Sequence, residues 1–302
     1  MGLGFANWFQ IVLYTLLLTC GLGNGVREIS KQNLQEPTSH GGEKNILLLA
    51  HSKEDEEKNY HQNHMHHAHL SSHMDASKIG FFTMKDLYVG KRMPITFPNK
   101  ESIPFLPREE ADSIPFSLSQ LPNLVHFFSI SVGSAQAKAM VETIRACELE
   151  PIKGETKLCA TSLESMLDFV RGIFGLEAPF KVLTTTHFPA PAMTLQQNYT
   201  FLELPKEISA SNMVACHPMP YPYAVFYCHS QGNKTKVFKI VVGGEDGNRV
   251  EAVAVCHMDT SHWSPNHISF RLLGFKPGTS PVCHFFSSSD LVWVSGSPPP
   301  TH

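Results

Sequence analysis

The chain has 302 residues, a formal net charge of −3 and a charged fraction of only 17%. This balance argues against a nucleic-acid-binding protein, because such proteins present strongly basic surfaces. We find no Ser-His-Asp arrangement, phosphate loop or paired-carboxylate motif, so the sequence indicates neither a hydrolase nor a kinase.

The N-terminus carries the features of a secretory signal peptide. Residues 8–18 form an apolar run that is too short to span a bilayer comfortably, and small residues follow at 21–25. We therefore predict a signal peptide over residues 1–25, with an uncleaved anchor as the alternative because no Lys or Arg precedes the apolar run. No later segment is apolar for long enough to span, so we expect no membrane span after processing.

Residues 26–78 have the composition of a disordered tail. A charge run occupies residues 53–58, and six histidines follow among Asn, Gln and Ser: His61, His64, His66, His67, His69 and His73. The cluster is interpreted either as a solvated, pH-sensitive segment or as a loose site for copper or zinc, since imidazole binds both metals well.

Two helices are predicted at the start of the folded region, which we place at residues 79–297. Ser134 can cap the first, and Thr161 with Glu164 forms a capping box for the second, which Gly175 ends. Apolar residues follow the helical period in both, at Ala137, Met140, Val141 and Ile144, and at Leu163, Met166, Leu167, Val170, Ile173 and Phe174.

After Phe180 the chain is strand-like and punctuated by Pro, Gly and Asn, as in the run from Lys236 to Val242. The predicted fold class is therefore α+β: a helical pair followed by a mainly antiparallel β part, disulfide-linked, with the disordered tail in front.

Cysteine usage agrees with an oxidising compartment. Cleavage after residue 25 would remove Cys20 and leave six cysteines, which favours disulfides over a thiolate metal site. We expect Cys147 and Cys159 to staple the helical pair into a hairpin. The other four, Cys216, Cys228, Cys256 and Cys283, permit three pairings that the sequence cannot rank. Sequons at Asn198 and Asn233 indicate glycosylation in the same compartment.

Each of those four cysteines is followed directly by a histidine: His217, His229, His257 and His284. Ten, 26 and 25 residues lie between successive Cys-His pairs. The segments before the second and third pairs are typical of strands, and neighbouring side chains on a strand point to opposite faces. Cysteines on the packed face would therefore turn the four imidazoles to the other face, where the strand ends can bring them together.

This spacing resembles the signature of the plant BURP domain, and particularly its seed-protein-like members. The resemblance covers about residues 80–295 and includes the residues between the pairs and a paired-phenylalanine opening: Tyr221, Pro222, Tyr223, Ala224, Val225, Met258, Asp259, Thr260, Ser261, Trp263, His267, Phe270, Pro277, Gly278, Pro281, Val282 and Phe285, with Phe81, Phe82, Leu87, Gly90 and Met93 upstream. The signature is specific for the family but not for one activity. Family members range from seed and dehydration-responsive proteins, through a wall-associated polygalacturonase subunit, to copper-dependent peptide cyclases.

The four histidines of the pairs are the candidate metal ligands. If the sulfurs form disulfides, nitrogen ligands remain, and an imidazole-rich site outside the cell suits copper best and zinc second. The resemblance also implies copper. Asp259, His262 and His267 lie near the third pair and are candidates for further ligands or for partners that fix a ring tautomer.

Two classes of function follow. The first is a non-catalytic secreted or vacuolar copper-binding module that associates with cell-wall polysaccharide or wall protein and serves seed or stress physiology. The alternative, implied by some BURP relatives, is a copper-dependent oxidative cyclase that crosslinks a Tyr or Trp side chain within a peptide substrate. Tyr60 is the single Tyr of the tail, which holds no Trp, and it is the candidate crosslink target. We expect the first class, because no repeated core peptide surrounds Tyr60.

Overall fold

The computed structural model describes residues 80–98, 103–188 and 196–296. The predicted signal peptide, the His-rich tail and Tyr60 lie outside these residues. No helix within the described ranges is long and apolar enough to cross a membrane.

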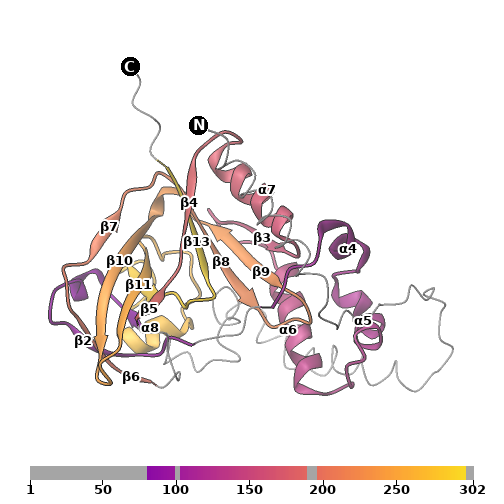
Figure 1. Cartoon of the computed structure of the whole chain (residues 1–302), viewed down its shortest axis with the longest axis horizontal. Coiled ribbons are helices and arrows are strands. Elements are labelled where there is room, and N and C mark those ends of the chain that lie inside the picture. Colours follow the sequence, from indigo (N-terminus) through magenta and orange to yellow (C-terminus); the bar gives the residue numbers. More distant parts are fainter. Residues whose placement is uncertain (1–79, 99–102, 189–195, 297–302) are drawn as a thin grey trace, which may run out of the picture. The chain divides into compact units, whose positions relative to one another are not determined.

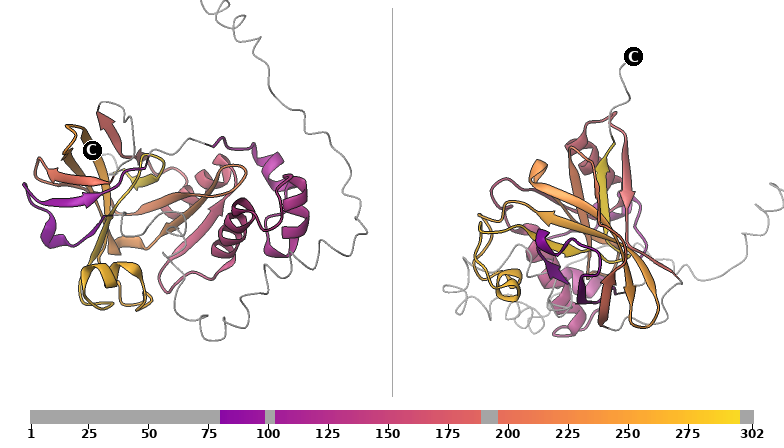
Figure 2. Two further views of the ribbon diagram at one scale, coloured as in Figure 1. Left: turned by 90° about the horizontal axis from the view of Figure 1, so that it is seen from below. Right: turned by 90° about the vertical axis from the view of Figure 1, so that its left-hand side faces the viewer.

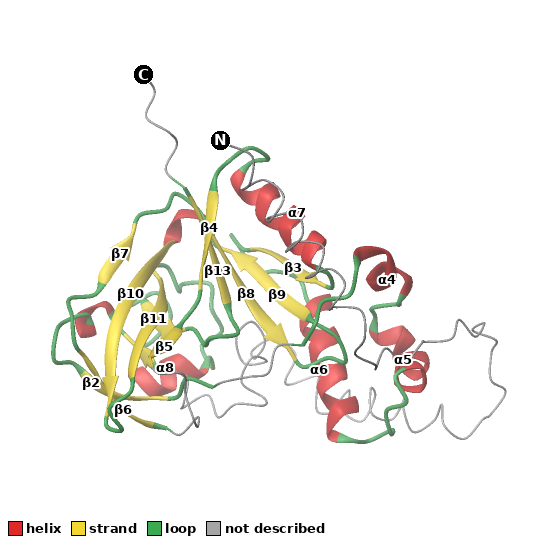
Figure 3. Ribbon diagram, in the orientation of Figure 1, coloured by secondary structure: helices red, strands yellow, loops and turns green. Residues whose placement is uncertain are grey.

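Strands dominate the described fold and form two sheets, while helices are fewer (Figure 3). The α-helices are α4 (Arg108–Ser113), α5 (Leu121–Phe127), α6 (Ala135–Glu148), α7 (Leu163–Phe174) and α8 (Ile268–Leu273). Short 3-10 turns are η3 (Met84–Asp86), η4 (Leu118–Gln120) and η5 (Gly232–Lys234).

The larger sheet has eight strands in the order β1-β12-β11-β10-β6-β2, with β5 added to β11 and β7 added to β10 (Figure 1). Its strands are β1 (Phe81–Phe82), β2 (Arg92–Ile95), β5 (Thr186–Phe188), β6 (Gln197–Phe201), β7 (Lys206–Ile208), β10 (Thr235–Gly244), β11 (Arg249–His257) and β12 (Val282–Phe285). All of its pairings are antiparallel.

The smaller sheet has five strands in the order β3-β9-β8-β13-β4, again all antiparallel. They are β3 (Thr156–Ala160), β4 (Phe180–Leu183), β8 (Met213–Met219), β9 (Val225–Ser230) and β13 (Leu291–Ser295). The predicted α+β class, with a mainly antiparallel β part linked by disulfides, is therefore confirmed. Figure 2 shows both sheets, and the yellow-orange connection through α8 between β11 and β12, from two further directions.

Both predicted helices are present. Ser134 caps α6 as expected, since its hydroxyl accepts a hydrogen bond from the amide of Ala137 at 3.1 Å. The cap predicted for α7 was wrong by one residue, because Ser162 rather than Thr161 closes the capping box, with Ser165 as its partner.

The expected helical hairpin is also wrong in one respect, because a strand separates the two helices. Cys147 and Cys159 form the expected bridge, but Cys159 lies in β3, which pairs with β9 at the edge of the smaller sheet. The bridge therefore ties the end of α6 to this sheet.

Alternation along the strands separates three apolar cores. Cys216 and Cys228 face the core that Met166 and Val170 of α7 cover. Cys256 and Cys283 face a second core, on the larger sheet. Side chains on the opposite face of these sheets meet in a third core, which the two sheets share: Met213, Ala215, Val237, Val253, Val255, Phe286, Val292 and Val294. The histidines that follow the cysteines lie on the same face of their strands as the residues of this inter-sheet core.

Candidate functional site

Two cross-strand disulfides fix the positions of the four histidines. Cys216 lies directly opposite Cys228 in the β8–β9 ladder, and Cys256 lies opposite Cys283 in the β11–β12 ladder. Both pairs are bridged, which resolves the three pairings that the sequence left open. In an antiparallel ladder, the residues that follow two opposed cysteines are diagonal neighbours on the other face.

The two ladders hold their histidines in the same way. The ring centroids of His217 and His229 lie 5.6 Å apart on the smaller sheet, and those of His257 and His284 lie 5.6 Å apart on the larger sheet. We call these four side chains the histidine ring, because contacts across the sheets close them into a circuit. His229 lies 6.3 Å from His257, and His217 lies 6.4 Å from His284.

The histidine ring is buried at one end of the inter-sheet core. Its four residues are only 2 to 8% exposed. Phe286 supports one side, with its ring 4.9 Å from the rings of both His217 and His284, and Trp263 packs 5.0 Å from His257. The cysteines therefore face the outer cores while the histidines face each other, as the alternation in the sequence predicts.

Each ring is oriented through its Nδ1 atom by an oxygen acceptor, which comes from a distant part of the chain for His217, His229 and His257 and from the next residue for His284. The acceptors are Oδ1 of Asp290 for His217 at 3.0 Å, Oε1 of Glu155 for His229 at 2.9 Å, Oε1 of Gln231 for His257 at 3.0 Å, and the carbonyl of Phe285 for His284 at 3.3 Å. Because these oxygens accept, Nδ1 carries the proton, and in a neutral imidazole the lone pair is then on Nε2. We call these oxygen-bearing groups the outer partners. Hydrogen bonds of this kind to Nδ1 fix the tautomer that ligates a metal through Nε2.

Burial favours the neutral form of the two rings on the larger sheet. It lowers the pKa of His284 to about 3, with a further contribution from His217. Burial, followed by the proximity of His284, lowers the pKa of His257 well below its ordinary value. Neutral imidazole is the form that binds metal ions.

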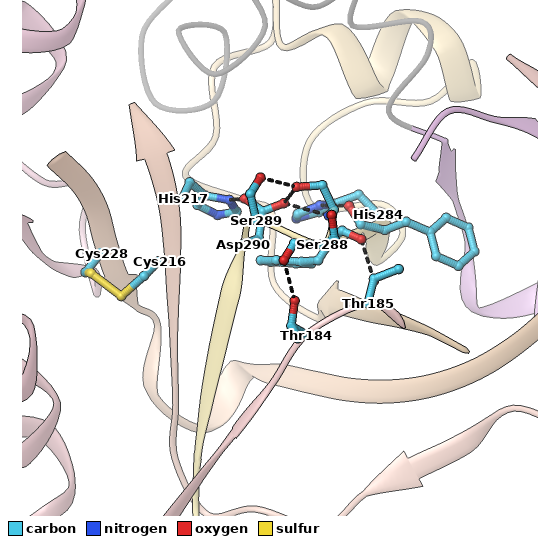
Figure 4. Close-up of polar contacts among 12 residues, drawn as sticks. Thr184, Thr185, Cys216, His217, Cys228, His284, Ser288, Ser289 and Asp290 are labelled. Carbon is cyan, nitrogen blue, oxygen red and sulfur yellow. Dashed lines mark hydrogen bonds and ion pairs between the residues drawn. A yellow bond between two sulfur atoms is a disulfide. The ribbon is translucent and has the colours of Figure 1, made fainter. Parts of the chain in front are cut away.

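Asp290 is fixed by a serine-rich turn (Figure 4). Its Oδ2 accepts hydrogen bonds from both the amide and the hydroxyl of Ser287 at 2.6 Å, while Oδ1 contacts His217. Burial opposes ionisation of this carboxyl, but the hydrogen bonds from His217 and Ser287 lower its pKa below the ordinary value. Asp290 is therefore an anion held against the histidine ring.

The structure places the three residues predicted near the third pair in different surroundings. Asp259 is bound to Lys234 at 2.7 Å and to Ser261, and these hydrogen bonds lower its pKa. His262 is exposed. His267 is buried and packs 4.8 Å from Trp263, but its Nδ1 accepts from the amide of Ser269 and caps α8. Its neutral tautomer is thus opposite to that of the histidine ring.

Sequence reasoning missed Glu155, Gln231 and Asp290. Glu155 and Asp290 lie 74 and 73 residues from their histidine partners, so no local pattern marks them. Gln231 follows His229 by two residues, but it contacts His257 on the other sheet. Only the long-range strand pairing could have revealed these three.

The glycosylation sequons lie on the larger sheet and beside it. Asn198 is in β6, where its amide donates to Oε1 of Glu245 at 3.1 Å. Asn233 lies in η5, between β9 and β10.

The histidine ring offers four imidazole nitrogens and no thiolate. No group of three or more His, Cys, Asp or Glu side chains within the described ranges already has the spacing of a formed metal site. The chemistry that the arrangement suits is ligation of a transition metal through nitrogen.

Comparison with known proteins agrees with the resemblance seen in the sequence. The BURP domain profile matches residues 80–295. The BURP domain-containing protein BNM2A of Brassica napus is 45% identical over 229 residues, which cover 73% of this chain and 81% of the relative. The BURP domain protein USPL1 of Arabidopsis thaliana is 42% identical, with the same coverage. The BURP domain protein RD22 of Arabidopsis thaliana is 40% identical over 74% of this chain and 57% of the relative. The chain therefore belongs to the BURP-domain family of plant proteins.

Proposed function

We propose that the protein is a non-catalytic copper-binding module of the secretory pathway, acting at the cell wall or in the vacuole. The histidine ring supports this most strongly, because four buried imidazoles face one another and each Nδ1 contacts an oxygen acceptor. A role in seed or stress physiology, through contact with wall polysaccharide or wall protein, is part of the same proposal and follows from the family resemblance.

The spacing of the rings is compatible with one ion after a small contraction. Four imidazoles that ligate one ion at about 2.1 Å through Nε2 have neighbouring centroids roughly 5 Å apart. The observed separations are 5.6 to 6.4 Å. The separations between neighbouring centroids would therefore shorten by about 0.6 to 1.4 Å. His217, His229, His257 and His284 would hold the ion.

Copper is favoured over zinc by the ligand set. All six cysteines of the described region are in disulfides, so no thiolate competes with the four imidazole nitrogens for the ion. Divalent copper binds nitrogen ligands more tightly than zinc does in the ordinary affinity series.

Burial of the histidine ring favours a structural role for the metal. Catalytic metal sites keep an open position for substrate, whereas structural sites are closed. The rings are 2 to 8% exposed, which leaves little access for the aromatic side chain of a peptide. A copper-dependent cyclase would need that access.

Copper stoichiometry tests the proposal. The protein from Val26 onward should retain one tightly held copper ion after gel filtration, measured by plasma mass spectrometry. Alanine at His217, His229, His257 or His284 should each reduce copper affinity by at least about tenfold, because one ligand of four is lost. The matched control His262→Ala changes an exposed histidine and should retain the ion.

Deletion of residues 61–73 separates the histidine ring from the His-rich tail. The deletion should remove only weakly held copper. If it abolished all binding while the four alanine variants bound normally, the site would be in the tail and the proposal would be wrong. Mass spectrometry of the same samples would expose a cyclase as a loss of about two mass units per crosslink, in the peptide containing Tyr60 or in an added substrate peptide.

A further inference from the structure

Two of the four outer partners of the histidine ring are carboxylates in the protein interior. The Glu155 side chain has no exposed surface, and its Oε2 accepts from the amide of Ile152 at 3.3 Å while Oε1 contacts His229. Asp290 is 14% exposed on its side chain and accepts from Ser287 as well as contacting His217. The smaller sheet therefore supplies two histidines that are each backed by an acid.

The two histidines of the larger sheet have uncharged partners instead. His257 contacts the amide oxygen of Gln231, and His284 contacts the carbonyl of Phe285. The histidine ring is therefore asymmetric, with both negative charges behind His217 and His229.

Lys157 is a nearby cation that interacts electrostatically with Glu155. Lys157 lies opposite His229 in the β3–β9 ladder, and its ammonium group donates to the carbonyls of Ala146 and Cys147 at 2.8 and 3.3 Å. Those carbonyls are at the end of α6, where a cation complements the helix dipole.

Glu155 and Asp290 lie 2.9 and 3.0 Å from the Nδ1 atoms of His229 and His217, and a negative charge there attracts a divalent ion more strongly than a monovalent one. This attraction is strong in a medium of low dielectric constant. The two carboxylates would therefore discriminate between ions by their charge, without changing the number of ligands.

We propose that Glu155 and Asp290 set the charge of the ion that the histidine ring accepts, and favour divalent over monovalent copper. This inference rests on the proposed copper-binding function and adds a role for two residues that do not ligate the metal. In this role they are positioning residues that also attract the ion through their charge.

The test compares the affinities of the purified protein for Cu(II) and Cu(I), each measured by competition with a chelator specific for that oxidation state. Glu155→Gln and Asp290→Asn remove one charge each and keep an amide oxygen that can accept from Nδ1. Each should lower the ratio of Cu(II) to Cu(I) affinity by about tenfold or more. A tenfold change in this ratio corresponds to a rise of about 59 mV in the one-electron reduction potential.

Gln231→Glu is the reciprocal variant, because it adds a carboxylate at the equivalent position behind His257. It should raise the same ratio. Thermal melting and circular dichroism select the variants that fold, and Glu155→Gln alone suffices if Asp290→Asn disrupts the serine-rich turn.

The outcomes separate this inference from the proposed function. An unchanged ratio, or equal losses for both oxidation states, would overturn the electrostatic role while leaving copper binding in place. A wild-type protein that binds neither oxidation state would overturn both, and it would be seen as absent binding instead of an unchanged ratio.

Discussion

Burial keeps several imidazoles uncharged in the folded protein. It lowers the pKa of His284 to about 3 and that of His267 to about 4. In the unfolded chain both should titrate near 6.5. Between these values the unfolded state binds more protons than the folded state, so the free energy of unfolding must fall as the pH falls.

Urea unfolding of the chelator-treated protein checks this sign. From pH 6.5 to 5, the free energy of unfolding should decrease by at most about 1.4 kcal/mol per pH unit for each such histidine. His267→Asn keeps a side chain that can cap α8 and removes one titrating ring, so its pH slope should be smaller. Stability that stays constant or increases on acidification over this interval would show that the rings are not held neutral by burial.

At the scale of single elements, the stability of helix α7 depends on its N-cap, which is Ser162 and not the adjacent Thr161. The Ser162 hydroxyl accepts from the Ser165 amide at 3.1 Å and is fully buried. Ser162→Ala should therefore cost about 1 kcal/mol of unfolding free energy, the usual value of an N-cap. Thr161→Ala is the matched control, and a larger loss there than at Ser162 would contradict the observed cap.

The elements that the sequence predicted correctly have strong local signals. The helical period around Ile144 and the alternation before the Cys-His pairs are properties of short segments. Strand β3 has no such signal, because only Ala160 of its five residues is buried and the strand is held by pairing with β9. The choice between Thr161 and Ser162 is likewise set by tertiary packing, since both residue types cap helices well.

In the candidate site, too, the sequence predicts the features that depend on neighbouring residues and misses those that depend on distant ones. Adjacency of Cys and His in the sequence predicts that sulfur and imidazole face opposite sides of a strand. The register that puts Cys216 opposite Cys228, and the acids behind the rings, depend on contacts between residues far apart in the chain. Glu155 in particular precedes β3 and reaches His229 across 74 residues of sequence.

At the scale of the whole molecule, the part of the chain that the structure describes contains three disulfides. One links α6 to the smaller sheet, one lies within that sheet, and one lies within the larger sheet. The Cys147–Cys159 bridge closes a loop with a sequence separation of 12, which should stabilise the fold by about 3 kcal/mol on the loop-entropy model.

Thiol labelling tests this network. The folded protein from Val26 onward should react with no maleimide, and after unfolding with reductant it should react at six cysteines. Stoichiometric labelling of a Cys-His cysteine in the folded protein would contradict the bridges and make a sulfur-ligated metal site tenable.

The central claim is that the two sheets together hold one copper ion through four histidines. X-ray absorption of the copper-loaded protein tests it most directly, because the copper edge reports ligand type and number. We expect four nitrogen ligands at about 2.0 Å with the outer-shell scattering of imidazole rings and no sulfur. A copper–sulfur distance near 2.3 Å, or a spectrum fitted by fewer than three imidazoles, would contradict it.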